Sequence, residues 1–136
     1  MTERKTVIDL ASFQSHLTVD DYKAIGADYA IVKTTESTNY VNPYIRSLID
    51  RSAGGGIKGF AFYHFGRFRN DAQAVAEANY FITNSKAQAN VQPGTLMILD
   101  AEISNMPTSS VIEFLNTVRN AGFHTGFYTY KYLLPN

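Results

Sequence analysis

Short runs of β-branched and aromatic residues alternate with helix-forming segments along the chain, and this alternation constrains the fold more than any other feature. The runs are almost continuously hydrophobic, which is typical of strands buried on both faces of a sheet. Strands separated by helices pair in parallel through right-handed crossovers. The sequence therefore predicts an α/β fold, barrel or open sheet, with five parallel strands at residues 6–11, 29–36, 57–66, 96–102 and 124–130.

The segments between these runs carry helix-start and helix-stop residues. Thr18 is a candidate N-cap with Asp21 three residues later, and Gly26 is a candidate terminator. Asparagine before proline is a second start signal, and a Ser-x-x-Glu capping box is a third. The predicted helices are at residues 17–26, 40–56, 70–90 and 107–122, with Asn42 and Pro43 starting the second and Ser110 and Glu113 forming the box of the fourth.

Every predicted strand finishes in polar or tyrosine side chains, which lie at the carboxyl ends of the strands. In parallel α/β folds, ligands bind at this edge and several strands contribute residues to one site. The sequence therefore predicts a cleft there. Its candidate residues are Asp9, Lys33 with Glu36, Tyr63 with His64, Asp100 with Glu102, and Tyr128 with Tyr130.

Two acids, Asp100 and Glu102, follow the most aliphatic run, LMIL. Residues two apart in a strand share a face at roughly 6.6 Å between Cα atoms. Two carboxyl groups in a partly dry cleft raise at least one pKa, which keeps an acid protonated near neutral pH. The alternative is that Asp100 caps the next segment and Glu102 is solvated. Asp9, at the end of another strand, favours the shared site.

The other candidates have structural alternatives. Tyr63 and Tyr128 suit either packing or sugar stacking, and His64 suits a hydrogen-bonded wall of the cleft. Lys33 suits either an ion pair with Glu36 or a substrate contact. The three histidines lack paired metal-ligand spacing, so we expect neither a metal nor a cofactor.

Charge and composition exclude several classes of partner. Twelve basic residues balance twelve acidic ones, so no overall field favours nucleic acid or an anionic membrane. The first residues lack the apolar core of a signal peptide, and no run approaches a membrane span. A neutral or polar ligand is favoured.

Six motifs together resemble, in order and spacing, the lysozymes of glycoside hydrolase family 25. They are DLASFQ, VKTTEST with YVNPY, GFAFYHF, AQAVAEANYF, LDAE and GFYTY. The resemblance implies a TIM-barrel-like β/α barrel and an N-acetylmuramidase that cleaves the β-1,4 bond between N-acetylmuramic acid and N-acetylglucosamine. It also implies a phage or prophage endolysin that leaves the host cytoplasm by holin-type release and acts on peptidoglycan.

The same resemblance implies roles for individual residues. Glu102 matches the general acid, Asp100 the carboxylate beside it, and Asp9 the acid of the first strand. The remaining positions match substrate contacts in the cleft: Tyr63, His64, Tyr128, Lys33 and Glu36. The distance between the two catalytic carboxyl groups distinguishes retaining from inverting enzymes. The Cα spacing of residues two apart in a strand is compatible with either route. It is also compatible with a route in which Asp100 orients the substrate's own N-acetyl group for attack.

Two features of this chain depart from the family 25 pattern, and a third argues against an alternative family. KTTES stands where the family commonly has KATEG, which places Ser37 at a glycine position. A β/α barrel normally needs about 200 residues, so residues 1–136 are expected to be the N-terminal portion of one catalytic domain, with open edges that self-associate. The rivals are a non-catalytic glycan-binding remnant and a chitinase-like barrel; the chitinase motif DxxDxDxE is broken by Ile98.

Overall fold

A computed structural model describes residues 5–129 of the chain. It contains all five predicted strands and all four predicted helices, and Tyr130 and the segment after it lie outside the described residues. The strands are β1 (Val7–Leu10), β2 (Tyr29–Glu36), β3 (Tyr40–Val41), β4 (Gly59–Phe65), β5 (Leu96–Asp100) and β6 (His124–Tyr128). The helices are α1 (Val19–Ile25), α2 (Ile45–Gly54), α3 (Asp71–Ala89) and α4 (Thr108–Asn120), with a short 3-10 turn, η1, at Ser12–Gln14.

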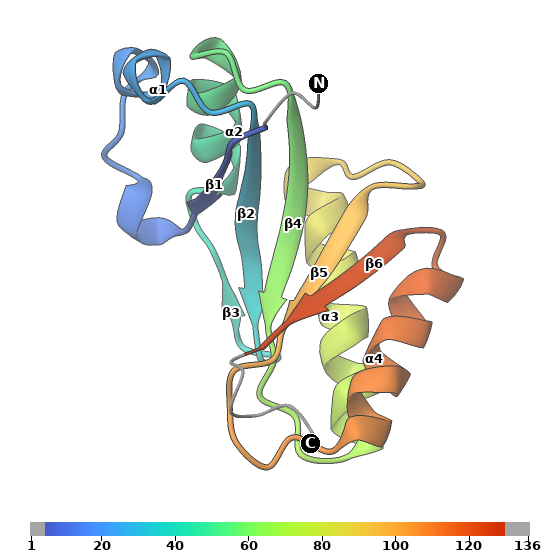
Figure 1. Cartoon of the computed structure of the whole chain (residues 1–136). Helices are drawn as coiled ribbons and strands as arrows, with labels where there is room; N and C mark the ends of the chain where they lie inside the picture. The colour runs from blue at the N-terminus through green and yellow to red at the C-terminus, as the bar shows by residue number, and fades with distance from the viewer. Residues whose placement is uncertain (1–4, 130–136) are drawn as a thin grey trace.

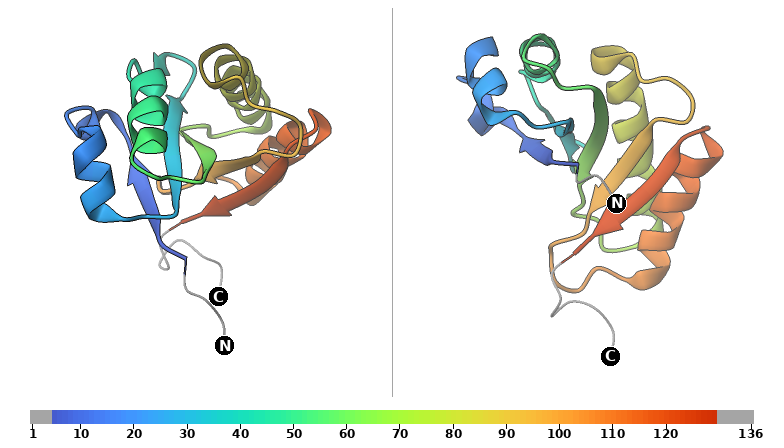
Figure 2. Two further views of the ribbon diagram at one scale, coloured as in Figure 1. Left: turned by 90° about the horizontal axis from the view of Figure 1, so that it is seen from above. Right: turned by 45° about the horizontal axis from the view of Figure 1, so that its top comes forward.

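One curved sheet organises these elements (Figure 1). Its strands run in the order β1-β2-β4-β5-β6, and every neighbouring pair in that order is parallel. Seen from above, all four helices lie outside the curve of the sheet (Figure 2). The α/β class and the parallel sheet are confirmed.

Alternate residues of each strand point to opposite sides of the sheet, because the side-chain period of a strand is two residues. Val32, Phe62 and Leu99 point to the helices and belong to the hydrophobic core. In the register of the sheet, Lys33 lies beside Tyr63 and Asp100 beside Tyr128. These polar residues therefore occupy the concave face, where no described helix covers them (Figure 2).

The sequence did not predict the short strand β3. It pairs antiparallel with the end of β2, with Thr35 beside Val41 and Glu36 beside Tyr40. Ser37, in the turn between the two strands, adopts a φ of 53°. This left-handed conformation favours glycine, so Ser37 occupies a backbone position where most side chains are strained.

The start of α1 is confirmed, whereas the predicted start of α2 is wrong. Thr18 accepts a hydrogen bond from the backbone of Asp21, and the Asp21 carboxylate accepts one from Thr18 N in return. In the second segment the helix begins at Ile45, and Asn42 lies before it. Asn42 Oδ1 accepts from Tyr44 N at 3.0 Å, as a cap would, and its amide also donates to the carbonyl of Lys33 at 2.9 Å, which ties the segment to β2.

The predicted capping box of α4 is also wrong. The helix begins at Thr108, two residues before Ser110. The Ser110 hydroxyl donates to Asp71 Oδ1 at 2.7 Å and so joins α4 to the start of α3. A tertiary partner has replaced the local cap. No helix within residues 5–129 combines the length and the apolar character needed to cross a membrane.

Candidate active site

Three acids from separate positions meet on the concave face of the sheet. Asp9 lies on β1, Asp100 ends β5, and Glu102 follows two residues later. The Tyr63 hydroxyl donates a hydrogen bond to Asp9, and the charge of Glu102 acts on the same carboxyl group. Partial burial is the main reason why the pKa of Asp9 is raised, and the Glu102 charge raises it further. The structure thus brings Asp9 and Glu102 to one site.

Asp100 is strongly perturbed by its surroundings. Its side chain is buried, and its Oδ2 accepts a 2.7 Å hydrogen bond from the Tyr128 hydroxyl. Burial, followed by a hydrogen bond with Glu102, raises the pKa of Asp100 to about 8. Oδ1 of Asp100 is buried and accepts no hydrogen bond from the described residues. An oxygen in this position suits a proton shared with Glu102, since it can donate rather than accept.

Two tyrosines supply hydroxyl groups to these acids. Burial and the neighbouring carboxylates raise the pKa of both Tyr63 and Tyr128, so both phenols stay protonated and act as donors. Tyr63 is buried and holds Asp9, which leaves its ring little surface for sugar stacking. Tyr128 is 41% exposed, and its ring remains open to a ligand while its hydroxyl holds Asp100.

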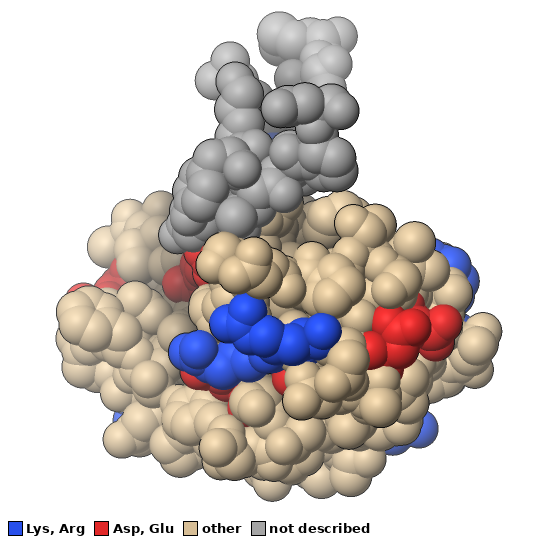
Figure 3. Space-filling view, turned by 90° about the horizontal axis from the view of Figure 1, so that it is seen from below, with Lys and Arg blue, Asp and Glu red and all other residues tan. Residues whose placement is uncertain are grey.

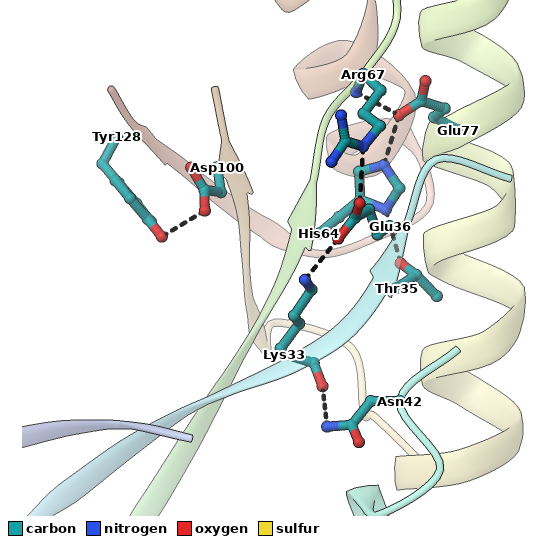
Figure 4. Close-up of polar contacts among 9 residues, drawn as sticks. All are labelled: Lys33, Thr35, Glu36, Asn42, His64, Arg67, Glu77, Asp100 and Tyr128. Atoms are coloured by element: carbon teal, nitrogen blue, oxygen red, sulfur yellow. Dashed lines mark hydrogen bonds and ion pairs between the residues drawn. The ribbon is translucent and has the colours of Figure 1, made fainter. Parts of the chain in front are cut away.

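Lys33 and Glu36 form an ion pair at the rim of the site. Lys33 Nζ lies 2.7 Å from Glu36 Oε1, and Arg67 Nε donates to Glu36 Oε2, also at 2.7 Å (Figure 4). The ammonium also lies over the rings of Tyr40 and Phe65, 5.4 and 5.3 Å from their centroids. The sequence left Lys33 either an ion pair with Glu36 or a contact with substrate, and the structure contains the ion pair.

His64 does not lie where the sequence analysis expected it. It is fully buried on the helix side of the sheet, where Phe81 and Phe114 flank its ring at centroid distances of 5.6 and 5.3 Å. Tyr63, its neighbour in sequence, points to the concave face. Because successive side chains of a strand point to opposite faces, His64 points to the helix side. The structure therefore corrects the expectation that His64 walls the cleft.

Sequence analysis missed the residues that surround His64. Its Nε2 lies 2.8 Å from Glu77 Oε1, and its Nδ1 lies 2.7 Å from the Thr35 hydroxyl (Figure 4). Glu77 is a buried acid in the alanine-rich helix α3. The available signal was its helical position between Ala74 and Phe81, because an acid on an apolar face of a helix needs a buried partner.

These acids and phenols can donate and accept protons. Among the described residues, no group of three or more histidine and acidic side chains is arranged to hold a metal ion. A protonated carboxyl beside an ionised one suits acid catalysis of a hydrolysis. The geometry of the site therefore supports general acid chemistry on a polar substrate.

The family model of glycosyl hydrolases family 25 matches residues 8–136. The chain belongs to this family. The lysozyme of Streptococcus phage Cp-9 is 30% identical to it over 130 residues, and lysozyme M1 of Streptomyces globisporus is 28% identical over 115 residues. These alignments cover 91% and 82% of this chain but 35% and 37% of the relatives, so the chain spans about a third of their length.

Solved structures of family 25 proteins share the fold. The catalytic domain of endolysin ply40, from bacteriophage P40 of Listeria monocytogenes, superposes with a TM-score of 0.77 at 17% identity. A family 25 hydrolase from Bacillus anthracis superposes with a TM-score of 0.74 at 18% identity. These matches cover 95% and 96% of this chain and 65% and 62% of those chains. The five parallel strands are thus similar to part of a β/α barrel-like fold.

Proposed function

We propose that this family 25 chain is a muramidase that hydrolyses the β-1,4 bond between N-acetylmuramic acid and N-acetylglucosamine in peptidoglycan. The relatives from Streptococcus phages Cp-9 and Cp-1 are lysozymes. The related Cpl-1 endolysin has been solved in complex with a peptidoglycan analogue. The observation that carries the proposal is the interacting pair of acids, Asp100 and Glu102, beside Asp9 on the concave face.

In the proposed reaction, Glu102 transfers its proton to the glycosidic oxygen as the bond to the anomeric carbon breaks. Positive charge develops on the sugar ring, and an ionised carboxylate of Asp9 or Asp100 stabilises it. Asp100 can also orient the N-acetyl group of the substrate. Water then adds to the anomeric carbon, and the proton that it releases restores the acid. Hydrogen bonds from Tyr63 and Tyr128 fix the acceptor oxygens.

The remaining parts of the proposal concern the domain and its place of action. Residues 1–136 would be the N-terminal portion of one catalytic domain, and glycan strands of the bacterial wall would be the partner. Lys33, Glu36 and Tyr128 would contact the sugars at the rim, since each retains some exposed surface. The enzyme would act on the bacterial wall after release from the host cytoplasm.

Release of reducing sugar from purified peptidoglycan tests the proposal directly. The chain should generate new reducing ends, and mass spectrometry of the reduced products should place them on N-acetylmuramic acid. Cosedimentation with peptidoglycan, without any new reducing ends, would instead support the glycan-binding alternative. Reducing ends on N-acetylglucosamine would contradict the assigned bond.

A further inference from the structure

A closed circuit of hydrogen bonds joins the helix side of the sheet to the rim of the site. Thr35 contacts His64, His64 contacts Glu77, and the same Glu77 oxygen accepts from the backbone N of Arg67 at 3.0 Å. The Arg67 side chain then donates to Glu36, the residue next to Thr35. Figure 4 shows these residues around the ends of β2 and β4.

A bulge in β2 makes the circuit possible. The register between β2 and β4 shifts between Lys33 and Thr35, so that both Thr34 and Thr35 are buried. A bulge inserts one extra residue and re-aims the side chains that follow it. Thr35 consequently reaches His64, while Lys33 and Glu36 both remain at the rim and pair with each other.

His64 is neutral in this circuit. Burial between aromatic rings lowers its pKa, although the Glu77 carboxylate opposes the shift. With Nε2–H donating to Glu77, Nδ1 is left to accept from the Thr35 hydroxyl. Both ring nitrogens and one Glu77 oxygen are then satisfied inside the core, where an unmade hydrogen bond costs about 1–3 kcal/mol. Such a network has one low-energy arrangement.

We propose that Arg67 and the buried His64–Glu77 pair are positioning residues: they fix Glu36, and through Glu36 they hold the Lys33 ammonium beside the acids of the site. Glu36 holds the Lys33 ammonium at ion-pair distance, 2.7 Å from Oε1. Without Glu36 in place, the long Lys33 side chain would sample other rotamers. The circuit thus sets the electrostatic environment of the proposed acid chemistry, and its link to activity rests on the proposed function.

The Lys33 ammonium acts on several groups that titrate. Its charge lowers the pKa of Asp9, Asp100 and Glu36. Figure 3 shows basic side chains beside acidic ones on this end of the molecule. The charged or titratable residues that interact with Lys33 or with its direct partners are Asp9, Glu36, Tyr40, Tyr63, His64, Arg67, Glu77, Asp100, Glu102 and Tyr128.

Carboxyl ¹³C NMR titration tests the proposal without requiring activity. Lys33→Met should raise the pKa of Asp9 by about one unit, because an adjacent opposite charge is lost. Arg67→Gln should raise it in the same direction by a smaller amount. In a Lys33→Met background, Arg67→Gln should add almost nothing, because a positioning effect disappears with the group that is positioned. An equal Arg67 effect in both backgrounds would mean that Arg67 acts through its own charge, and would overturn the proposal.

Two further variants separate the buried pair from the exposed arginine. Thr35→Val removes the hydroxyl that closes the circuit, and His64→Gln removes the ring; either should give the Arg67→Gln shift if the variant keeps the wild-type circular dichroism spectrum. Arg46→Gln is the control, since it removes a guanidinium from an exposed pair with Asp50 on α2. If Thr35→Val folds and leaves the Asp9 pKa unchanged, the buried pair has no positioning role.

The same variants connect the circuit to the reaction. If the chain cleaves peptidoglycan, both limbs of the pH profile of kcat/KM should move to higher pH in Lys33→Met and Arg67→Gln but not in Arg46→Gln. Unmoved limbs together with raised NMR pKa values would show that the positioned ammonium does not serve catalysis. An inactive wild type with the expected NMR shifts would contradict the muramidase function and leave the circuit in place.

Discussion

At the scale of single residues, contacts make two similar acids chemically different. Asp100 is buried and accepts a hydrogen bond from Tyr128, whereas Glu102 is half-buried and lies where the chain leaves β5. The interaction between the two carboxyl groups raises the pKa of Asp100, which favours a single proton on the pair near neutral pH. The proton belongs to the pair, and a coupled pair titrates as a unit. Glu102, the more accessible member, is the one able to reach a glycosidic oxygen.

Glu102→Gln should abolish nearly all muramidase activity. The amide is nearly the same size as the carboxyl group but cannot deliver a proton, and general acid catalysis is worth about 10²- to 10⁴-fold. Initial rates of reducing-sugar release measure the loss. The control is Glu113→Gln on the exposed face of α4, which should retain wild-type rates. Turnover of Glu102→Gln within about tenfold of wild type would remove Glu102 from the acid role.

Asp100 should make the folded state less stable as the pH rises from 7 to 9. Its folded pKa of about 8 lies above the ordinary value of 3.8, so the folded chain binds more protons than the unfolded chain in this range. Stability that is present at low pH is therefore lost as the pH passes the folded pKa, by about 1 kcal/mol for one group that titrates across this window. Urea denaturation at the two pH values measures the difference.

Asp100→Asn is the matched comparison for that pH dependence. The amide keeps the shape but does not titrate, so the slope of unfolding free energy between pH 7 and 9 should flatten. His64 adds little to the pH dependence of stability between pH 7 and 9. Its lowered pKa keeps the ring neutral in the folded state, and the ring in the unfolded chain is also largely neutral above pH 7. An unchanged slope in the variant would assign the proton to another group.

At the scale of elements, close contact between helices depends on a glycine. Gly54 ends α2 and Gly55 follows it. A Cβ atom on Gly55 would lie 2.3 Å from Tyr22 Cβ and 2.9 Å from the carbonyl oxygen of Val19, both in α1. Backbone and Cβ atoms cannot yield as the tip of a side chain can. The glycine run, which the sequence analysis interpreted as a loop, is therefore also a packing contact.

Gly55→Ala should destabilise the chain by about 1–3 kcal/mol, the usual cost of inserting a methyl group into a packed contact. The control is Gly54→Ala, whose Cβ would meet Val19 at an ordinary distance of 3.4 Å. Thermal denaturation followed by circular dichroism compares the two. Equal melting temperatures for both variants would mean that α1 moves away from α2 at little cost.

At the scale of the whole molecule, the sheet is curved but its outer strands pair on one side only. Among residues 5–129, β1 pairs with β2 alone and β6 with β5 alone. Val7 on β1 is 56% exposed and Phe127 on β6 is 50% exposed. Unpaired strand edges with apolar side chains recruit other strands. Self-association through these edges therefore stays a prediction for this chain.

Light scattering at increasing concentration should show association of the 136-residue chain. Phe127→Lys should reduce it, because a charge on an edge strand opposes strand addition. Phe13→Lys is the matched control: Phe13 is 82% exposed, but it lies in η1 and outside the sheet. A monomer at every concentration would contradict edge-driven association, and an equal effect of both variants would indicate nonspecific hydrophobic contact.

Local signals were sufficient to predict most of the fold and part of the site. The strands and helices follow from hydrophobic period and from caps such as Thr18 with Asp21, whose bonds span three residues. Strand ends in a parallel sheet share one edge, so the sequence alone places Asp9, Asp100 and Glu102 together. Ser110 was misassigned because it found a distant partner, Asp71, in place of the local cap. Asn42 keeps a local bond from Tyr44 N and also bonds Lys33, but the helix begins only at Ile45.

The sequence by itself determined the α/β order of elements and the edge at which the acids meet, because both depend on periodicity and chain direction. Only the tertiary structure decided which face each polar side chain takes and what it contacts. The bulge in β2 turns Thr35 toward the helix side of the sheet, and the alternation of side chains along β4 turns His64 to the same side. There His64 contacts both Thr35 and Glu77. A shift of one residue reverses every side chain after it, so such contacts depend on register, which packing between distant segments sets.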